Sequence, residues 1–446
     1  MSNTLTTENT DSVFVCDCEE DVRSACTGEP FYGEHEAKRY CVLHYPGKGK
    51  SKDFKESLKR KLEAKNSDFR GIWFPDRVSS QIFDFGAKAW FSGATFNETA
   101  DFSGIEFSAE VDFSYATFKA EVYFSDSTFN AKADFRSAEF GANADFIKTT
   151  FNATAYFRFS KFSREANFET RFNAEVDFLY AIFVGEAYFR YATFKAKVNL
   201  RSATFSSYAR FGEHGFVGQS SLDLQYARIE KPDHVSFHTL ALRPHWFVNV
   251  DVRKFDFTNI EWRGSIDQEI ENLRLKKIVL PRLLITITYR QLAVNAEENH
   301  RYDEASDFRY KAMHTLRPEK WRGFTPWRLG WWYWLASGYG ERILQAFGVL
   351  IVVWLLFALL YTQVGFVRWE PRLTSESDVA TAKRDETGEP LRPPRAFAYS
   401  LGVMTLQRPE PRPATLAAQS VVILETIFGP LQAALLALAI RRRFMR

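Results

Sequence analysis

Phenylalanine recurs along the chain from Phe91 to Phe216 at spacings that alternate between five and six residues. Together the two spacings make an internal repeat of eleven residues. A small or β-branched residue stands two places before most of these phenylalanines, as Ala133 does before Phe135, and a polar residue lies between them. Self-similarity at a fixed period predicts a solenoid, in which each repeat packs on its neighbours.

The directions of the side chains favour strands for this repeat. In a strand the residues at i and i+2 share a face, so Ala133 and Phe135 point inward while Asp134 points outward. A helix would place phenylalanines five residues apart at about 140° from each other, which leaves no single apolar stripe. A membrane β-barrel would need alternating segments of about ten residues. In this sequence the alternation lasts three residues before a polar corner.

The segment 144–148, with the sequence ADFIK, resembles a pentapeptide repeat, in the Phe-rich variant with alternating spacings of five and six. The resemblance implies a mainly β fold, a right-handed quadrilateral β-helix over residues 71–264 with about 22 residues per turn. About six regular turns stacked at the inter-strand spacing would measure roughly 28 Å. The four-residue spacing from Phe168 to Phe172 predicts a bulge near 169–171, and the looser pattern after Phe216 predicts irregular last turns.

A Cys/His cluster is predicted in residues 1–47. The first eleven residues have no basic start and no apolar stretch, so we expect no secretory signal and a cytoplasmic, reducing environment. Thiolate and imidazole are ligands that tetrahedral Zn²⁺ prefers, and four of the five candidates would suffice. Two interpretations stay open: a zinc knuckle that caps the first coil, or reduced and inert cysteines in an arm. The candidate ligands are Cys16, Cys18, Cys26, Cys41 and His44.

The spacing of apolar residues predicts helices both before and after the solenoid. Residues 48–70 contain seven lysines around Phe54, Leu58 and Leu62, which predicts a short basic linker helix. Residues 265–320 resemble a single tetratricopeptide-type hairpin. One hairpin cannot bury a core alone, so we expect it to pack on the end of the solenoid or on a partner.

The C-terminal part of the chain predicts a membrane domain with two spans. Residues 343–366 carry no formal charge and are long enough to cross a hydrocarbon core of about 30 Å. A second span lies in 415–446 and ends in three arginines, and 367–394 is the external loop between the spans. The tryptophan-rich segment 321–342 predicts an interfacial helix. We therefore expect an integral protein of the inner or plasma membrane, with the N-terminal domain and the C-terminal tail in the cytoplasm.

Residues 395–414 lie between the spans and are apolar but too short to cross a membrane. The order of outer helix, re-entrant helix, loop and inner helix resembles the two-span pore module of potassium-type channels, and the resemblance implies four subunits around a pore. The positions that would form the filter are Thr405, Leu406 and Gln407. No glycine follows Thr405 there, so the carbonyl ladder of that family is not reproduced.

Polar residues and a Gly-Pro pair interrupt the second span. A carboxylate at this depth faces a bundle interior or water, so Glu425 is expected to line a pore or a subunit interface, or to make a structural interhelix hydrogen bond. Gly429 and Pro430 predict a kink or hinge, with Gln432 beyond them.

Composition narrows the function classes. The chain of 446 residues has 58 basic and 55 acidic side chains, which argues against a dedicated nucleic-acid binder. No phosphate-binding loop or nucleophile motif is present in the sequence, so we expect no enzyme, no catalytic residue and no organic cofactor. The leading hypothesis is a membrane-anchored scaffold that binds a cytoplasmic protein and self-associates, as a tetramer in its channel-like form. The alternatives are an ion channel with a cytoplasmic β-helix sensor, or an anchor without conduction.

Overall fold

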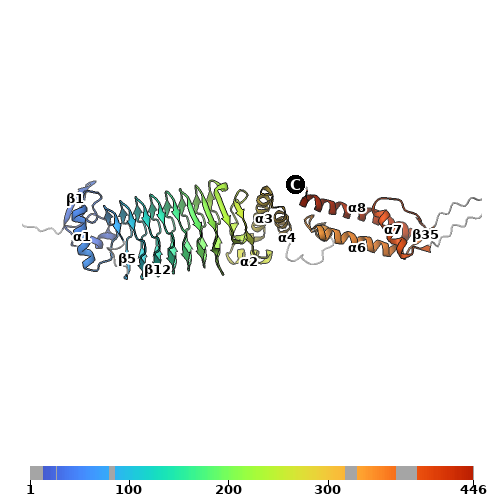
Figure 1. Ribbon diagram of the computed structural model, residues 1–446, viewed down its shortest axis with the longest axis horizontal. Coiled ribbons are helices and arrows are strands. Elements are labelled where there is room, and N and C mark those ends of the chain that lie inside the picture. The colour runs from blue at the N-terminus through green and yellow to red at the C-terminus, as the bar shows by residue number, and fades with distance from the viewer. Residues whose placement is uncertain (1–13, 27, 80–85, 317–328, 368–388, 445–446) are drawn as a thin grey trace, which may run out of the picture. The chain divides into compact units, whose positions relative to one another are not determined.

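The computed structural model describes residues 14–26, 28–79, 86–316, 329–367 and 389–444 (Figure 1). The chain forms two compact units, Met1–Gln291 and Leu292–Arg446. The predictions for the first eleven residues, for residues 317–328 of the hairpin and interfacial segment, and for most of the external loop lie outside the described residues.

The first unit begins with a small cap that contains the cysteines. It consists of a 3₁₀ helix η1 (Glu20–Cys26), an antiparallel pair β1 (Phe31–His35) and β2 (Lys38–Cys41), and helix α1 (Ser51–Glu63). Helix α1 falls within the predicted basic segment, and its Phe54 ring packs edge-on against Phe74 of the first coil, with 5.6 Å between centroids. The main-chain N–H of Trp73 donates to the carbonyl of Leu43 at 3.0 Å, so the cap is bonded to the solenoid edge.

The solenoid consists of stacked coils of short parallel strands (Figure 1). Equivalent strands of successive coils pair with one another and form four parallel sheets. The eight-stranded sheet contains β3 (Trp73–Phe74), β6 (Thr95–Phe96), β10 (Thr117–Phe118), β14 (Glu139–Phe140), β18 (Lys161–Phe162), β22 (Ile182–Phe183), β26 (Thr204–Phe205) and β30 (Arg228–Ile229). The seven-stranded sheet contains β5 (Ala89–Trp90), β9 (Val111–Asp112), β13 (Ala133–Asp134), β17 (Ala155–Tyr156), β21 (Val176–Asp177), β25 (Lys197–Asn199) and β29 (Ser221–Asp223).

Two further sheets complete the coils. The nine-stranded sheet contains β4 (Val78–Ser79), β7 (Ala100–Asp101), β11 (Val122–Tyr123), β15 (Ala144–Asp145), β19 (Ala166–Asn167), β23 (Ala187–Arg190), β27 (Ala209–Gly212), β31 (Val235–His238) and β33 (Asp256–Thr258). The six-stranded sheet contains β8 (Glu106–Phe107), β12 (Thr128–Phe129), β16 (Thr150–Phe151), β20 (Arg171–Phe172), β24 (Thr193–Phe194) and β28 (Gly215–Phe216), and β32 (Ala241–Leu242) pairs with β34 (Glu261–Trp262).

The strand register confirms the predicted β-solenoid. Thr117 pairs with Thr95 on one side and with Glu139 on the other, which is 22 residues per coil. The Phe118 ring stacks on Phe96 at 4.8 Å and on Phe140 at 5.2 Å, so the phenylalanines form continuous columns in the core. The solenoid has about eight turns, more than the six regular turns expected, because less regular coils at both ends continue the stack.

The core of two neighbouring coils contains inward threonine hydroxyls that are paired. Thr149 and Thr170 occupy the position of Ser127 on the preceding coil and of Ala192 on the following coil, and both threonines are buried. The Thr149 hydroxyl donates to the carbonyl of Phe124 and the Thr170 hydroxyl to that of Phe146, each at 2.7 Å. A buried hydroxyl is costly only when it lacks a partner, so these residues link successive coils.

The four-residue spacing after Phe168 produces a shortened corner, and the expectation of a bulge was wrong. Arg171 pairs with Thr150, a coil of 21 residues, and no residue in 168–171 has a positive φ. The equivalent corners use a left-handed residue such as Lys148 or Tyr191, with φ of 56° and 61°. Losing one corner residue leaves the strands in register. The coils after Phe216 are irregular as expected, with two 3₁₀ turns, η3 (Pro232–His234) and η4 (Pro244–Phe247).

Helices follow the solenoid in chain order. Helix α2 (Ile266–Leu275) begins at a capping box between Ser265 and Gln268. Helices α3 (Pro281–Glu298) and α4 (Tyr302–Thr315) are joined by residues 299–301, within the predicted hairpin. In the second unit, Arg309 of α4 contacts Glu297 at 2.6 Å between Nη1 and Oε2.

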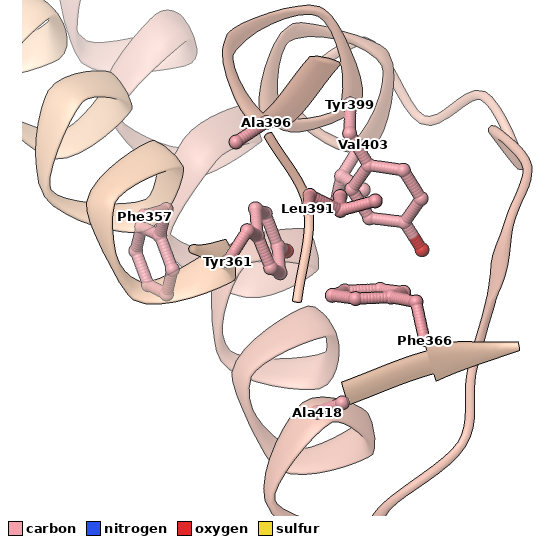
Figure 2. Close-up of a cluster of buried hydrophobic side chains, with 8 residues drawn as sticks. All are labelled: Phe357, Tyr361, Phe366, Leu391, Ala396, Tyr399, Val403 and Ala418. Atoms are coloured by element: carbon pink, nitrogen blue, oxygen red, sulfur yellow. The ribbon is translucent and has the colours of Figure 1, made fainter. Parts of the chain in front are cut away.

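The rest of the second unit contains the two long apolar helices. Its elements are α5 (Leu329–Ser337), α6 (Ile343–Tyr361), α7 (Pro393–Met404) and α8 (Leu416–Phe444), with a small sheet of β35 (Gly365–Val367), β36 (Glu389–Pro390) and β37 (Arg412–Pro413). Helix α6 ends at Tyr361, so residues 362–366 of the predicted first span lie beyond it. Figure 2 shows the cluster in which α6, α7 and α8 meet, built around Tyr361, Phe366 and Tyr399.

Candidate functional site

The cap brings four of the five predicted ligands together. Cys16 precedes η1, Cys26 ends η1, Cys41 ends β2, and His44 follows in the next turn. Their ligand atoms all lie within 4.8 Å of one another and all four residues are buried. Three sulfurs and one imidazole at this separation are a donor set suited to a tetrahedral Zn²⁺. The part of the chain that the structure describes contains a Cys₃His cluster, and the residues present fit a zinc ion.

Hydrogen bonds orient the ligands of the cluster. The Nε2 atom of His44 lies 3.0 Å from the carbonyl oxygen of Arg70 and Nδ1 lies 3.4 Å from the Sγ of Cys41. A hydrogen on Nε2 donates to that carbonyl, so the lone pair of Nδ1 faces the sulfurs; metal-bound histidines are commonly oriented in this way. The main-chain N–H of Cys41 points to the Sγ of Cys16 at 3.4 Å.

Cys18 lies beside the cluster, outside the group of four. Its Sγ is 3.9 Å from that of Cys26, and the side chain is half-buried. Contacts among the thiols separate their pKa values. Hydrogen bonding from Cys18 lowers the pKa of Cys16, whereas hydrogen bonding to Cys16 raises the pKa of Cys41 to about 12.

The polar residues predicted in the second span make interhelix contacts. Glu425 is fully buried and accepts hydrogen bonds from the hydroxyls of Tyr361 on α6 and Ser400 on α7. Gln432 donates through Nε2 to the carbonyls of Ala336 at 2.7 Å and Ala346 at 2.8 Å. Helix α8 is therefore bonded to α5, α6 and α7. These contacts match the interhelix alternative for Glu425 within one chain, and its part in a pore stays a prediction.

The Gly-Pro pair lies where α7 approaches α8. A Cβ on Gly429 would stand 2.9 Å from the Cγ and 3.2 Å from the Cα of Met404, so the glycine permits this contact. Pro430 lies inside the helix, which continues through it. Thr405, Leu406 and Gln407 follow the end of α7 and are exposed. Whether these residues form a filter or a hinge also stays a prediction.

One coil of the solenoid has an outward surface that the sequence analysis missed. Tyr180, Ile182 and Val184 all point outward on the coil of β22 and are 49%, 40% and 43% exposed. The equivalent residues of the next coil are Ser202, Thr204 and Ser206. The Phe159 ring of the preceding coil is 57% exposed and stacks on Tyr180 at 5.2 Å. We call Phe159, Tyr180, Ile182 and Val184 the apolar patch.

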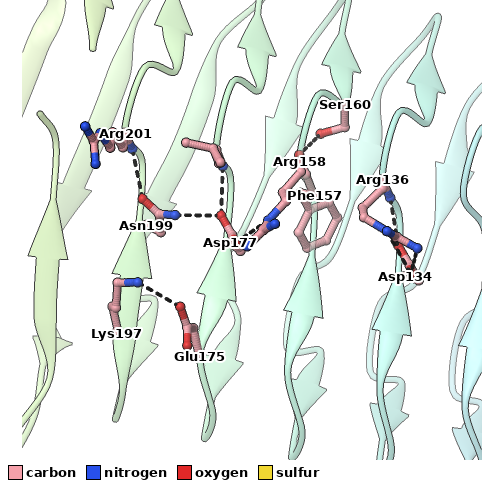
Figure 3. Close-up of polar contacts among 11 residues, drawn as sticks. Asp134, Arg136, Phe157, Arg158, Ser160, Glu175, Asp177, Lys197, Asn199 and Arg201 are labelled. Carbon is pink, nitrogen blue, oxygen red and sulfur yellow. Dashed lines mark hydrogen bonds and ion pairs between the residues drawn. The ribbon is translucent and has the colours of Figure 1, made fainter. Parts of the chain in front are cut away.

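Two basic residues lie on the coils on either side of Ile182. Lys161 pairs with Ile182 on one side and with Glu139 on the other. Arg201 lies on the coil after that of Tyr180, and its guanidinium is 5.3 Å from the ring centroid of Tyr226 on the following coil. Among the described residues, neither Lys161 nor Arg201 makes an ion pair. Arg158 is paired with Asp177 on the adjacent face, with 2.5 Å between Nε and Oδ2, and Asp177 also accepts from Asn199 (Figure 3). The apolar side chains in the outward positions 180, 182 and 184 were the sequence signal for this surface.

The comparisons with known proteins identify the repeat. A family model described as pentapeptide repeats (9 copies) matches residues 91–136 and 113–161. This part of the chain therefore carries pentapeptide repeats, as the Phe-rich spacing predicted. No curated protein and no solved structure gives a significant match.

Two helices of the described chain are long and apolar enough to cross a membrane. They are Ile343–Tyr361, with 19 residues, and Leu416–Arg442, with 27 residues. Only 17% of the most apolar stretch of each is buried within the protein. Apolar helices with so much exposed surface differ from the core helices of soluble domains. The chain therefore combines pentapeptide repeats in residues 91–161 with two candidate membrane helices.

Proposed function

We propose that this protein is a membrane-anchored scaffold: its two apolar helices fix it in the inner or plasma membrane, and its cytoplasmic solenoid binds an acidic protein partner through the apolar patch. The observation that carries the proposal is the row of Tyr180, Ile182 and Val184 on one coil. Exposed contiguous apolar side chains with a polar rim mark interaction sites. No catalytic role is assigned to the chain.

The charges at the rim define the partner. Lys161 and Arg201 offer positive charge and make no ion pair among the described residues, and Glu139 pairs with Lys161 in register on the side away from the patch. A partner segment with apolar anchors and flanking Asp or Glu satisfies both features, because complementary charges steer association and disfavour wrong partners. A second copy of the same patch would bring like charges together. We therefore assign self-association to the two apolar helices, and a tetramer is the oligomeric state to be tested.

Matched substitutions test the scaffold function. Ile182→Asp and Val184→Asp place charge in the patch, whereas Thr204→Asp and Ser206→Asp place it at the equivalent positions of the next coil. We expect the first pair to abolish co-isolation of a specific acidic protein from detergent-solubilised membranes, with all four variants still membrane-bound and folded. Equal loss in both pairs, or no loss in either, contradicts the proposal.

We propose in addition that the Cys₃His cluster holds a structural zinc ion. The ligands would be Cys16, Cys26, Cys41 and His44, whose donor atoms are already gathered within 4.8 Å. A closed four-ligand site supplies folding energy and no catalysis, so the zinc would hold the cap on the first coil. Metal analysis of freshly purified, reduced protein should give one zinc per chain, and Cys41→Ser should remove it. A chain that is folded but free of zinc excludes this role.

A second candidate function is an ion channel with a cytoplasmic sensor. The observation that favours it is Glu425, which joins α6, α7 and α8 by accepting from Tyr361 and Ser400. These bonds hold the short helix between the two long ones, as a pore-like module requires. Single-channel recording from purified protein in planar bilayers tests it. A complete absence of conductance, unchanged by Glu425→Gln, leaves the scaffold as the function of the chain.

A further inference from the structure

Two lysines of the cap are buried beside the Cys₃His cluster. Lys50, at the start of α1, is 1% exposed, and Lys61, in α1, is 8% exposed. Lysine is almost never buried to this degree unless its charge is compensated. The other lysines of α1 lie on its open side; Lys59, for example, is 76% exposed in its side chain.

Both ammonium groups bind the backbone of the ligand-bearing loops. The Nζ of Lys50 donates to the carbonyls of Val42 at 2.6 Å and Leu43 at 3.1 Å, the two residues between Cys41 and His44. The Nζ of Lys61 donates to the carbonyl of Ala25 at 2.8 Å, next to Cys26. The carbonyls of these loops therefore face the lysines, while an N–H of the same region faces a sulfur.

The charge of these lysines needs an anion. Among the described residues, neither Lys50 nor Lys61 makes an ion pair with a carboxylate. Burial lowers the pKa of Lys50 to about 7, and the charge of Cys41 opposes this shift. Burial also lowers the pKa of Lys61, against the charges of Asp68, Cys26, Glu29 and Cys41. A buried ammonium ion without a counter-charge is costly. For Lys50 the negative charge within reach is that of the clustered thiols. Lys61 is also near Asp68, which is paired with Arg70, and Glu29, which is paired with Arg60.

Metal binding would supply that charge. Three thiolates around a divalent cation leave a net charge of about −1, whereas three neutral thiols leave none. We propose that Lys50 and Lys61 are counter-ions of an anionic tris-thiolate metal centre, and that they position its two ligand loops through the carbonyls of Ala25, Val42 and Leu43. This inference rests on the proposed zinc site and extends it to residues that bind no metal themselves.

Zinc affinity of the full-length protein in detergent tests the role of the lysines. Lys50→Met and Lys61→Met should each weaken zinc binding 10- to 100-fold in competition with a metallochromic chelator, as outer-shell substitutions do. Lys59→Met, on the exposed side of the same helix, should change the affinity less than about twofold. Both lysine variants binding zinc as tightly as the wild type would overturn the inference.

A second readout separates a counter-ion from a lysine that merely supports the fold. Mass spectrometry after alkylation reports how well zinc protects the cysteines. Without metal, the cysteines of Lys50→Met and of the wild type should be alkylated at equal rates, because the substitution removes an uncompensated charge. With zinc, the cysteines of the wild type should be protected from alkylation and those of the variant should be poorly protected. Faster alkylation of Lys50→Met in both states would show a structural role and contradict the inference. Wild-type protein that binds no zinc would instead refute the metal site itself.

Discussion

The Nε2 atom of His44 lies 3.0 Å from the carbonyl oxygen of Arg70, and this contact joins the Cys₃His cluster to the first coil of the solenoid. The carbonyl belongs to the residue before Gly71, whose φ is +65° and whose missing side chain leaves room for the imidazole; a Cβ there would stand 3.3 Å from Nε2. The cap is therefore built against an edge that would otherwise expose unpaired strand groups.

Metal removal should loosen this cap and leave the middle of the solenoid intact. Treatment with a strong chelator should increase hydrogen exchange in residues 69–74, because the ligand loops bonded to the first coil lose their cross-link. Residues 183–211 should exchange as before. Hydrogen exchange with mass spectrometry measures both segments in one sample, and equal exchange in 69–74 with and without chelator would show that the cluster does not secure the cap.

The phenylalanine columns should dominate the stability of the solenoid. Phe140 is 1% exposed and stacks on Phe118 and on Phe162, the latter at 4.6 Å. Phe140→Ala should cost about 3–5 kcal/mol, because it leaves a cavity in a close-packed column. Tyr115→Ala, at a corner where the ring is 67% exposed, should cost about 0.5 kcal/mol or less. Urea unfolding followed by circular dichroism compares the two, and similar midpoints would contradict the column as the main support.

A glycine pair tests the packing of helices α7 and α8 in the second unit. Gly429→Ala should lower the thermal stability of the detergent-solubilised chain by about 1–3 kcal/mol, because its Cβ would overlap Met404 of α7. Gly348→Ala on α6 meets nothing within 4 Å and should be neutral or slightly stabilising, since alanine favours helix. Thermal unfolding of both variants gives the answer, and equal effects would mean that α7 does not pack on α8 in this way.

One buried carboxylate should give the solenoid a defined acid sensitivity. Burial raises the pKa of Asp134, but hydrogen bonds from Arg136 and Lys132 outweigh burial and hold that pKa below its usual value. The stabilisation is therefore present at neutral pH, above the unfolded pKa of about 3.9, and is lost as the pH falls through the folded pKa. Asp134→Asn should lower the free energy of unfolding at pH 7 and have a smaller effect at pH 3. An effect of equal size at both pH values would contradict this assignment.

The sequence predicted the solenoid well because one rule of side-chain direction acts in every coil. It did not predict the shortened corner after Phe168, since a missing corner residue and a bulge give the same irregular spacing. The Cys₃His cluster was predicted as five candidate ligands, because spacing alone cannot show that Cys18 lies outside the group of four. The contacts of Lys50 with Val42 and Leu43, and the apolar patch, depend on which residues neighbouring segments bring together in space. Those neighbours are set by the fold of the cap and by the stacking of coils.

The scaffold function is tested most directly by site-specific cross-linking on the solenoid surface. A photo-reactive phenylalanine analogue replaces Ile182 in one variant and Thr204, its neighbour on the next strand, in another, and both are irradiated in intact cells. We expect a discrete cross-linked protein in the membrane fraction from position 182 only, with acidic residues in the attached peptide. Adding Lys161→Glu and Arg201→Glu should abolish this product. The same products from both positions, or none from position 182, would contradict the scaffold function.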